Sequence, residues 1–232
     1  IVYMEISELF SKSDAICFDF DSTIINYEGL DKLAKQKGCY DVVSSITKNA
    51  MDNYDSLYES LKKRLDIIKP TYDDICYYKN NISSNNISFG LLSLFNYLKY
   101  KNKDIFIISG GFEQLILPYV EKFNFPVENT FCNSIIFDNN GNYKNFDEDR
   151  LTCKSKGKNK VINIIKNKYK NIIMIGDGIT DLETKDDVLC FIGYGGNCIR
   201  KNVKDNSSYY YTDFNKLLDD ITKDDYIYAN HF

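Results

Sequence analysis

Two aspartates separated by one residue follow the first apolar run of the chain and are well placed to do chemistry. Asp19 and Asp21 come directly after Ile16–Phe18, whose bulky side chains are typical of a buried strand. Side chains two apart on a strand share a face, so both carboxylates would lie at its carboxyl end, where open α/β sheets bind ligands. Such a pair can hold Mg²⁺, and one member can attack an electrophile covalently. The alternative is a solvated strand end with two exposed acids.

Two further segments could bind the phosphoryl group of a substrate. Ser109-Gly110-Gly111 follows the apolar run Ile105–Ile108 and offers a hydroxyl and backbone N–H groups that can cradle a phosphate, although a plain strand-to-helix turn looks similar. Lys158 lies in a lysine-rich stretch, residues 154–160, ahead of a helical pattern. Local composition favours a solvated surface or a weak nucleic-acid patch for that stretch.

A second pair of acids follows another apolar run. Asp177 and Asp181 come after Ile172–Ile175 in a segment flanked by glycines. Acids at a strand end beside glycines suit a hard cation, and the spacing of an EF-hand is absent from the segment. A parallel sheet would bring this strand end to the same edge as Asp19 and Ser109.

The elements that must position these residues alternate along the chain. Helical spacing of apolar residues lies between most of the apolar runs, which predicts an α/β fold with a mostly parallel sheet and right-handed crossovers. Five runs predict strands, at residues 15–18, 104–108, 172–175, 188–192 and 209–212.

One long interval breaks this alternation. Residues 28–80 contain helical stretches and no convincing strand, which predicts a helical cap inserted after the first strand. The remaining residues, 1–27 and 81–232, would form the core. A β-hairpin is expected from Asn133 to Phe146, turning at Asn139-Asn140-Gly141.

Composition excludes several classes of function. The 232 residues are 44% hydrophobic and 27% charged, as in a globular protein, and the net charge of −4 argues against nucleic acid as a partner. No apolar stretch reaches the roughly 20 residues that span a bilayer, so no membrane association is expected. His231 is the single histidine, which excludes histidine-based catalysis and histidine metal clusters.

Cysteine usage favours a reducing compartment. The seven cysteines are scattered, form no CxxC pair and in several cases lie inside apolar runs. A cytoplasmic location is therefore expected, although the start at Ile1 leaves an upstream targeting segment open.

The order of the motifs resembles that of the haloacid dehalogenase-like (HAD) superfamily of phosphohydrolases. Asp19–Thr23 matches the first motif, Ser109–Gly111 the second, Lys158 the third and Gly176–Asp181 the fourth. The match is closer still to the members that hydrolyse O-phosphoserine, the last step of phosphorylated serine biosynthesis, and it runs from about Leu9 to Leu218. The resemblance implies a Rossmann-like parallel sheet core, an inserted helical cap of the C1 type and a small β-hairpin.

The resemblance also implies a reaction that passes through a phosphorylated enzyme. Asp19 would attack phosphorus to form an aspartyl-phosphate, and Asp21 would act as the general acid and then the general base. Mg²⁺ would be the cofactor, held by Asp19, the backbone carbonyl of Asp21, and Asp177. Thr180 and Asp181 would support those ligands.

Substrate contacts are implied by the same resemblance. Ser109, Gly110 and Lys158 would bind the phosphoryl oxygens. In the cap, Glu28 would lie near the ammonium group of O-phosphoserine, Arg64 near its carboxylate, and Met51 would supply an apolar contact. Without the resemblance, Glu28 and Arg64 would be interpreted as exposed helix charges.

One departure from the family pattern and two alternative functions stay open. Asp52-Asn53 stands where the family commonly has two glycines, which puts cap movement and substrate affinity in question. A related phosphatase or phosphotransferase acting on another small phosphate ester would keep the four motifs. A non-catalytic protein that binds a phosphorylated ligand would be expected to lose Asp19, Asp21 or Lys158, and this chain keeps all three. The sequence leaves a homodimer open.

Overall fold

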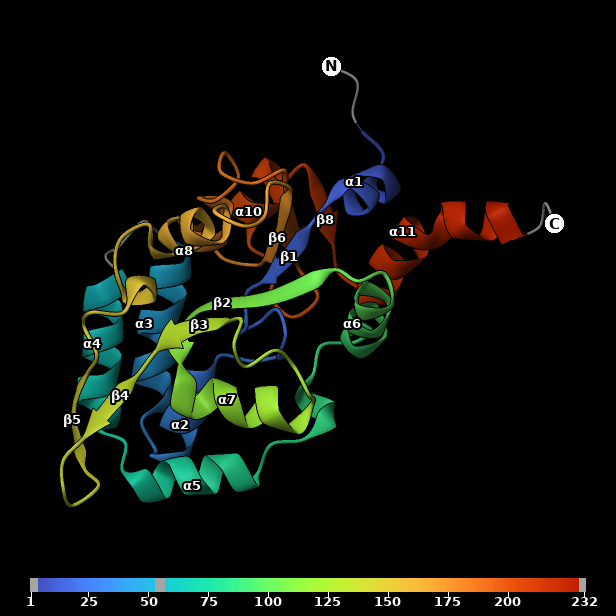
Figure 1. The fold of residues 1–232 in the computed structure, drawn as a ribbon. Coiled ribbons are helices and arrows are strands. Elements are labelled where there is room, and N and C mark those ends of the chain that lie inside the picture. Colours follow the sequence, from blue (N-terminus) through green and yellow to red (C-terminus); the bar gives the residue numbers. More distant parts are fainter. Residues whose placement is uncertain (1–3, 53–56, 230–232) are drawn as a thin grey trace.

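A six-stranded parallel sheet lies at the centre of the molecule in a computed structural model (Figure 1). The structure describes residues 4–52 and 57–229. Within these ranges it describes every side chain except those of residues 50–52 and 224–229. The strands lie in the order β3-β2-β1-β6-β7-β8, and every neighbouring pair is parallel. They are β1 Ala15–Phe18, β2 Asp104–Phe112, β3 Thr130–Asn133, β6 Ile172–Gly176, β7 Cys190–Tyr194 and β8 Tyr209–Tyr211.

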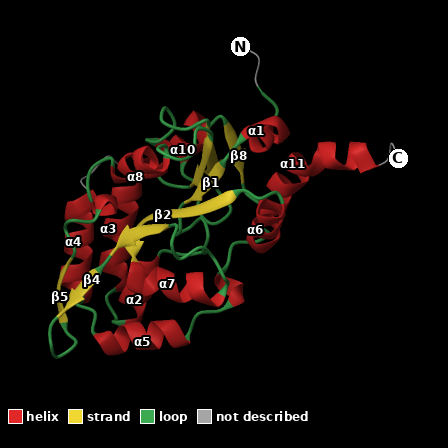
Figure 2. Ribbon diagram, in the orientation of Figure 1, coloured by secondary structure: helices red, strands yellow, loops and turns green. Residues whose placement is uncertain are grey.

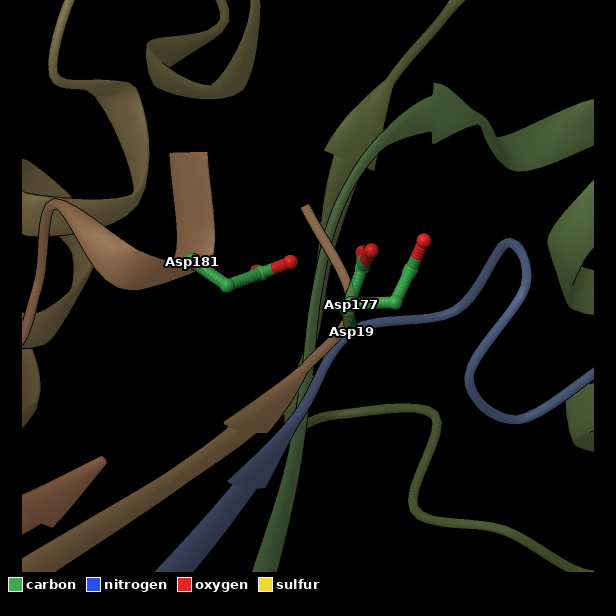
Figure 3. Close-up of side chains that lie close together, drawn as sticks. All are labelled: Asp19, Asp177 and Asp181. Atoms are coloured by element: carbon green, nitrogen blue, oxygen red, sulfur yellow. The ribbon is translucent and has the colours of Figure 1, made fainter. Parts of the chain in front are cut away.

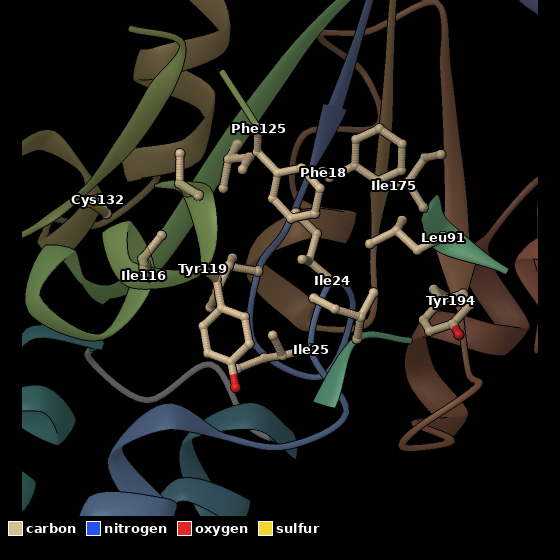
Figure 4. Close-up of a cluster of buried hydrophobic side chains, with 14 of the residues drawn as sticks. Phe18, Ile24, Ile25, Leu91, Ile116, Tyr119, Phe125, Cys132, Ile175 and Tyr194 are labelled. Atoms are coloured by element: carbon tan, nitrogen blue, oxygen red, sulfur yellow. The ribbon is translucent and has the colours of Figure 1, made fainter. Parts of the chain in front are cut away.

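The two faces of the sheet carry separate hydrophobic clusters because successive side chains point to opposite sides. In β1, Ala15 and Cys17 join the cluster that packs on α8 (Gly157–Ile165), α9 (Ile179–Leu182) and α10 (Lys201–Asn206). Ile16 and Phe18 join the larger cluster on the other face, part of which Figure 4 shows. That face is covered by α1 Ile6–Lys12, α6 Leu91–Tyr100, α7 Glu113–Lys122 and α11 Phe214–Ala229. The structure also has two short 3-10 helices, η1 Ser84–Asn86 and η2 Leu151–Cys153.

Between β1 and η1, the described residues form four helices, which gather on one side of the sheet (Figure 1). They are α2 Gly29–Gln36, α3 Tyr40–Asp52, α4 Leu57–Ile68 and α5 Tyr72–Asn80. Ile25 and Ile87 form an isolated antiparallel bridge, so the segment leaves and rejoins the rest of the chain at one place. The division into a cap at 28–80 and a core at 1–27 and 81–232 stays a prediction.

The expected hairpin is confirmed. Its strands, β4 Ile135–Phe137 and β5 Tyr143–Phe146, pair antiparallel (Figure 2). Gly141 in the turn has φ of 78°, a conformation that suits glycine. The turn contacts the helical segment, because the backbone N–H of Tyr72 donates to the Gly141 carbonyl over 2.8 Å.

The α/β class with a parallel sheet is confirmed, with local differences. The second strand runs four residues further than expected, to Phe112, and the fourth expected strand begins at Cys190 rather than Val188. The short strand β3 was not expected, because it places only two apolar side chains, Phe131 and Cys132, in sequence. Among the described residues, no helix combines the length and the apolar character that a membrane crossing needs.

Candidate active site

The site lies where the order of the sheet reverses. From β1 the chain builds outward through β2 and β3, then returns to β6 on the other side of β1. Ligands of open α/β sheets bind at such a switch point, beyond the carboxyl ends of the strands. Asp19 directly follows β1 and Asp177 directly follows β6. The backbone N–H of Asp19 donates to the carbonyl of Ile175 over 2.9 Å, which holds the two strand ends together.

Three buried carboxylates converge at this point. One oxygen from each of Asp19, Asp177 and Asp181 lies within 4.8 Å of the others (Figure 3). Asp181 reaches the group from α9, where its Oδ2 atom accepts a hydrogen bond from the Gly178 N–H over 3.0 Å. The structure therefore brings together three acids that are up to 162 positions apart in sequence (19 against 181).

Lys158 lies between two of these acids. Its Nζ atom is 2.7 Å from Oδ1 of Asp19 and 2.6 Å from Oδ1 of Asp181, and only 4% of its side chain is exposed. Burial alone would lower the pKa of Lys158, but the charges of Asp181 and Asp19 raise it above its usual range. The lysine is therefore a buried cation, and the solvated surface that local composition favoured is wrong for this residue.

Asp21 enters the site through a turn rather than as part of a strand. The carbonyl of Phe20 accepts from the N–H groups of Ile24 and Ile25, so the chain turns directly after Asp19. Oδ1 of Asp21 accepts from the Gly29 N–H over 2.8 Å. Oδ2 lies against Gly111, where a Cβ atom would come within 2.7 Å of it. A residue other than glycine would displace the Asp21 carboxylate.

Burial favours the protonated form of Asp21. It raises the pKa of this carboxyl well above its usual range, and the charges of Glu28 and Asp19 act in the same direction. The Gly29 hydrogen bond and the charge of Arg64 oppose the shift in part. These shifts favour the protonated form of Asp21, and a general acid must carry a proton.

A cavity of about 330 Å³ opens above these residues. Ser109, which is 1% exposed, and Gly110 line it from the end of β2, and the Oγ atom of Ser109 accepts from the Gly111 N–H over 2.9 Å. Its remaining walls come from both the sheet edge and the helical segment. The lining residues named by the sequence prediction are Asp19, Asp21, Arg64, Ser109, Gly110, Lys158 and Thr180.

Arg64 is buried at the wall of this cavity on α4. Its Nη1 atom donates to the Thr47 hydroxyl over 3.3 Å, and that hydroxyl donates to Oδ1 of Asp31. Burial lowers the pKa of Arg64, whereas the charges of Glu28, Asp31 and Asp21 oppose that shift. The guanidinium of Arg64 carries five N–H donors in a planar arrangement, and a carboxylate can accept from two of them at once.

Glu28 faces a different space. It accepts from the Ser22 hydroxyl over 2.7 Å and lines a neighbouring cavity of about 720 Å³ rather than the one above Asp19. Its charge still shifts the pKa values of Asp21 and Arg64, so it belongs to the same electrostatic cluster. The side chains of Met51 and Asp52 and all of Asn53 lie outside the described residues, so the predicted contact of Met51 and the effect of Asp52-Asn53 stay predictions.

Comparison with known protein families decides the class of the chain. The model of the haloacid dehalogenase-like hydrolases matches residues 13–184. The chain belongs to this family. It is 41% identical to phosphoserine phosphatase of Homo sapiens over 225 residues, which cover 95% of this chain and 99% of the human protein. It is 37% identical to phosphoserine phosphatase of Drosophila melanogaster, with 91% of this chain and 79% of that protein covered.

Solved structures agree with this assignment. A phosphoserine phosphohydrolase-like protein from Francisella tularensis superposes on this HAD-like hydrolase with a TM-score of 0.80 at 30% sequence identity. The match covers 88% of this chain and 98% of the Francisella protein. The similarity therefore extends over most of the chain.

The sequence prediction missed one charged residue of the hydrolase. Arg200 donates from Nε to Oδ2 of Asp177 over 2.9 Å, and its Nη2 atom lies 3.4 Å from Oε1 of Glu28. It thus connects the sheet edge with the start of the helical segment. The only signal in the sequence was its position shortly after the apolar run that becomes β7.

The acidic cluster of this HAD-like hydrolase fits a hard divalent cation. Burial raises the pKa of Asp177 to about 7, and burial and the charge of Asp19 raise that of Asp181. A bound cation would favour the ionised form of both acids, which burial disfavours. Carboxylate oxygens are the ligands that Mg²⁺ prefers. The donor set therefore suits the predicted ion.

Proposed function

We propose that this hydrolase is a Mg²⁺-dependent phosphomonoesterase that converts O-phosphoserine to serine and phosphate through an aspartyl-phosphate at Asp19. The observation that carries the proposal is the single cavity that both Asp19 and Asp21 line together with Ser109, Lys158 and Arg64. This set offers a nucleophile, a proton donor, phosphoryl ligands and a carboxylate ligand within one enclosed space.

The reaction proceeds in two displacements. In the first, a carboxylate oxygen of Asp19 bonds to phosphorus, the bond from phosphorus to the seryl oxygen breaks, and Asp21 gives its proton to that oxygen. In the second, Asp21 takes a proton from water as the water oxygen attacks phosphorus and the acyl-phosphate bond breaks. Serine and phosphate leave, and Asp19 and Asp21 return to their starting states.

Charge near the phosphoryl group is supplied by buried side chains. Lys158 is fixed by Asp19 and Asp181 and needs little rearrangement to contact a phosphoryl oxygen. The Ser109 hydroxyl and the backbone at Gly110 bind the other oxygens. Asp19, Asp177 and the backbone carbonyl of Asp21 would hold Mg²⁺, with Thr180 and Asp181 as support. The ion would offset the negative charge of the phosphoryl group.

The helical segment acts as the cap and recognises the amino acid part of O-phosphoserine. Arg64 pairs with the substrate carboxylate because its guanidinium can bind both oxygens. Glu28 pairs with the ammonium group, and this contact requires its carboxylate to turn from Ser22 toward the catalytic cavity. The phosphoserine phosphatases at 37–41% identity support this substrate. A cytoplasmic location and a homodimer stay predictions.

Phosphate release from matched substrates tests the proposal. We expect O-phosphoserine to be the best substrate in Mg²⁺ and no release after the ion is removed with EDTA. O-phosphoethanolamine lacks the carboxylate and tests Arg64, whereas 3-phosphoglycerate carries a hydroxyl in place of the ammonium and tests Glu28. Each should lose at least about tenfold in kcat/KM, because an unpaired charge in a closed site costs roughly 2–5 kcal/mol.

The same assay separates the alternatives. If the protein prefers a phosphate ester whose alcohol part carries no charge, its substrate is another small phosphate ester rather than O-phosphoserine. Serine release that exceeds phosphate release in the presence of an added alcohol would identify a phosphotransferase. Binding of phosphoserine without release of either product would identify a non-catalytic protein.

A further inference from the structure

The phosphate-binding segment interrupts the pairing of β2 with β3. Ile108 is opposite Phe131 and Phe112 is opposite Asn133, so Ser109, Gly110 and Gly111 face a single residue of β3. Regular ladder bonds therefore cannot satisfy every backbone group of these residues. Something outside the ladder must fix their positions, and all three residues line the cavity that would hold the phosphoryl group.

Asn133, at the end of β3, fixes the position of residues 109–111 through its side chain. Its side chain has no solvent exposure. Its Nδ2 atom donates to the carbonyl of Gly110 over 2.8 Å, and its Oδ1 atom accepts from the Thr152 hydroxyl over 2.7 Å. The two contacts use the donor and the acceptor of the amide separately, and neither a carboxylate nor an aliphatic side chain can make both.

Thr152 connects this amide to the segment that carries Lys158. It lies in η2, whose backbone packs so closely on the first turn of α8 that a Cβ atom at Gly157 would overlap the carbonyl oxygen of Leu151. Lys158 is the next residue along that turn. A shift of η2 would therefore be transmitted to Lys158.

We propose that Asn133 is a positioning residue for phosphoryl transfer, which holds the segment 109–111 and the start of α8 in register through Gly110 and Thr152. The inference rests on the proposed phosphatase function. It assigns Asn133 no contact with the substrate. Its effect comes from the geometry of Ser109 and Lys158, and reaction rates are sensitive to displacements of about 1 Å.

The Asn133→Asp variant removes the donor to Gly110 and keeps the shape of the side chain. We expect kcat/KM to fall about tenfold to a hundredfold, by a similar factor for O-phosphoserine and for an aryl phosphate, because both share the phosphoryl group. The affinity for inorganic phosphate, measured by calorimetry, should fall by a factor similar to that for kcat/KM. This second readout does not depend on turnover.

Asn129→Asp is the matched control. Asn129 makes the same kind of bond, from Nδ2 to the Ile105 carbonyl over 3.0 Å, and it links the same two strands at the end away from the cavity. The control variant should keep the kcat/KM and the phosphate affinity of the wild-type protein. Thr152→Val removes the hydroxyl that donates to Asn133, so it should lose part of the kcat/KM and phosphate affinity that Asn133→Asp loses. If Asn133→Asp does not fold, Thr152→Val tests the positioning role instead.

The outcomes separate this inference from the proposed function. Suppose that the wild-type protein is active. If Asn133→Asp then has the same kcat/KM and phosphate affinity as the control Asn129→Asp, the positioning role is wrong. Thr152→Val takes the place of Asn133→Asp in this comparison if that variant does not fold. A lower Tm with both values unchanged at a temperature where the variant is folded would also overturn it. If the wild-type protein hydrolyses no phosphomonoester, the proposed function fails, and weaker phosphate binding by Asn133→Asp would still support the positioning of the segment.

Discussion

At the sheet edge, Lys158 contacts Asp19 and Asp181 over 2.7 and 2.6 Å, whereas in the helical segment Arg64 reaches Thr47 and Ser60 over 3.3 Å. The first set has short bonds between full charges, and Asp19 is fixed at the end of a central strand while Lys158 and Asp181 come from two helices that pack on the sheet. The second depends on helices and on longer bonds to neutral groups. Under the proposed function, we expect the sheet edge to carry out chemistry on any phosphate ester and the helices to decide which ester is accepted. Changes at the edge should therefore affect all substrates, and changes in the helices should discriminate among them.

The largest effect is expected at the edge, from Asp19→Asn. The amide keeps the shape of the side chain but cannot act as the nucleophile, so kcat should fall by about three or more orders of magnitude. Lys158 retains Asp181 as a partner, so the fold should survive. Steady-state kinetics with O-phosphoserine and with an aryl phosphate should give equal losses, and thermal unfolding should confirm a folded variant. Near-normal turnover would rule out the covalent mechanism.

A smaller and selective effect is expected from Arg64→Ala. Loss of the guanidinium leaves the substrate carboxylate unpaired, so kcat/KM for O-phosphoserine should fall by roughly tenfold to a thousandfold. An aryl phosphate, which lacks both charges of the amino acid, should change much less.

The control for Arg64→Ala is Lys63→Ala, which removes an exposed cation from the adjacent position of α4. This variant should leave both substrates unaffected. Equal losses on the two substrates in Arg64→Ala would mean that Arg64 supports the fold of the helices rather than selecting the substrate.

The smallest effect is expected from Thr47→Val, which removes the hydroxyl between Arg64 and Asp31 without changing the size of the side chain. Loss of one such hydrogen bond is worth about 1 kcal/mol, so kcat/KM for O-phosphoserine should fall about threefold to tenfold. Ser44→Ala is the control on the same helix, because the Ser44 hydroxyl donates to the backbone carbonyl of Asp41 rather than to Arg64 or Asp31. An equal loss on an aryl phosphate would place Thr47 in the chemistry rather than in recognition.

The residues at the sheet edge could be predicted because their positions follow from strand order. In a parallel sheet the carboxyl ends of β1, β2 and β6 meet at one edge, so a pattern of apolar runs that end in Asp19, Ser109 and Asp177 is informative by itself. Lys158 is different, because its local composition indicates a solvated surface. Only the order of the motifs pointed to a role for Lys158 as a phosphate ligand.

The remaining contacts depend on tertiary packing. Arg200 and Asn133 act through partners 23 residues away, Asp177 and Gly110, and no spacing rule connects such positions. Glu28 was assigned to the substrate from the family pattern, yet it faces the neighbouring cavity and bonds to Ser22. Side-chain direction at the junction of sheet and helices is set by packing, which the sequence pattern does not encode.

The central claim is that Asp19 carries the phosphoryl group during turnover. The most direct measurement mixes the protein with O-phosphoserine labelled at phosphorus in the presence of Mg²⁺, stops the reaction in acid within milliseconds and locates the label by peptide mass spectrometry. We expect one phosphorylated peptide, with the phosphoryl group on Asp19, and no labelled peptide from Asp19→Asn. A label on another side chain, or equal labelling of Asp19→Asn, would contradict the account.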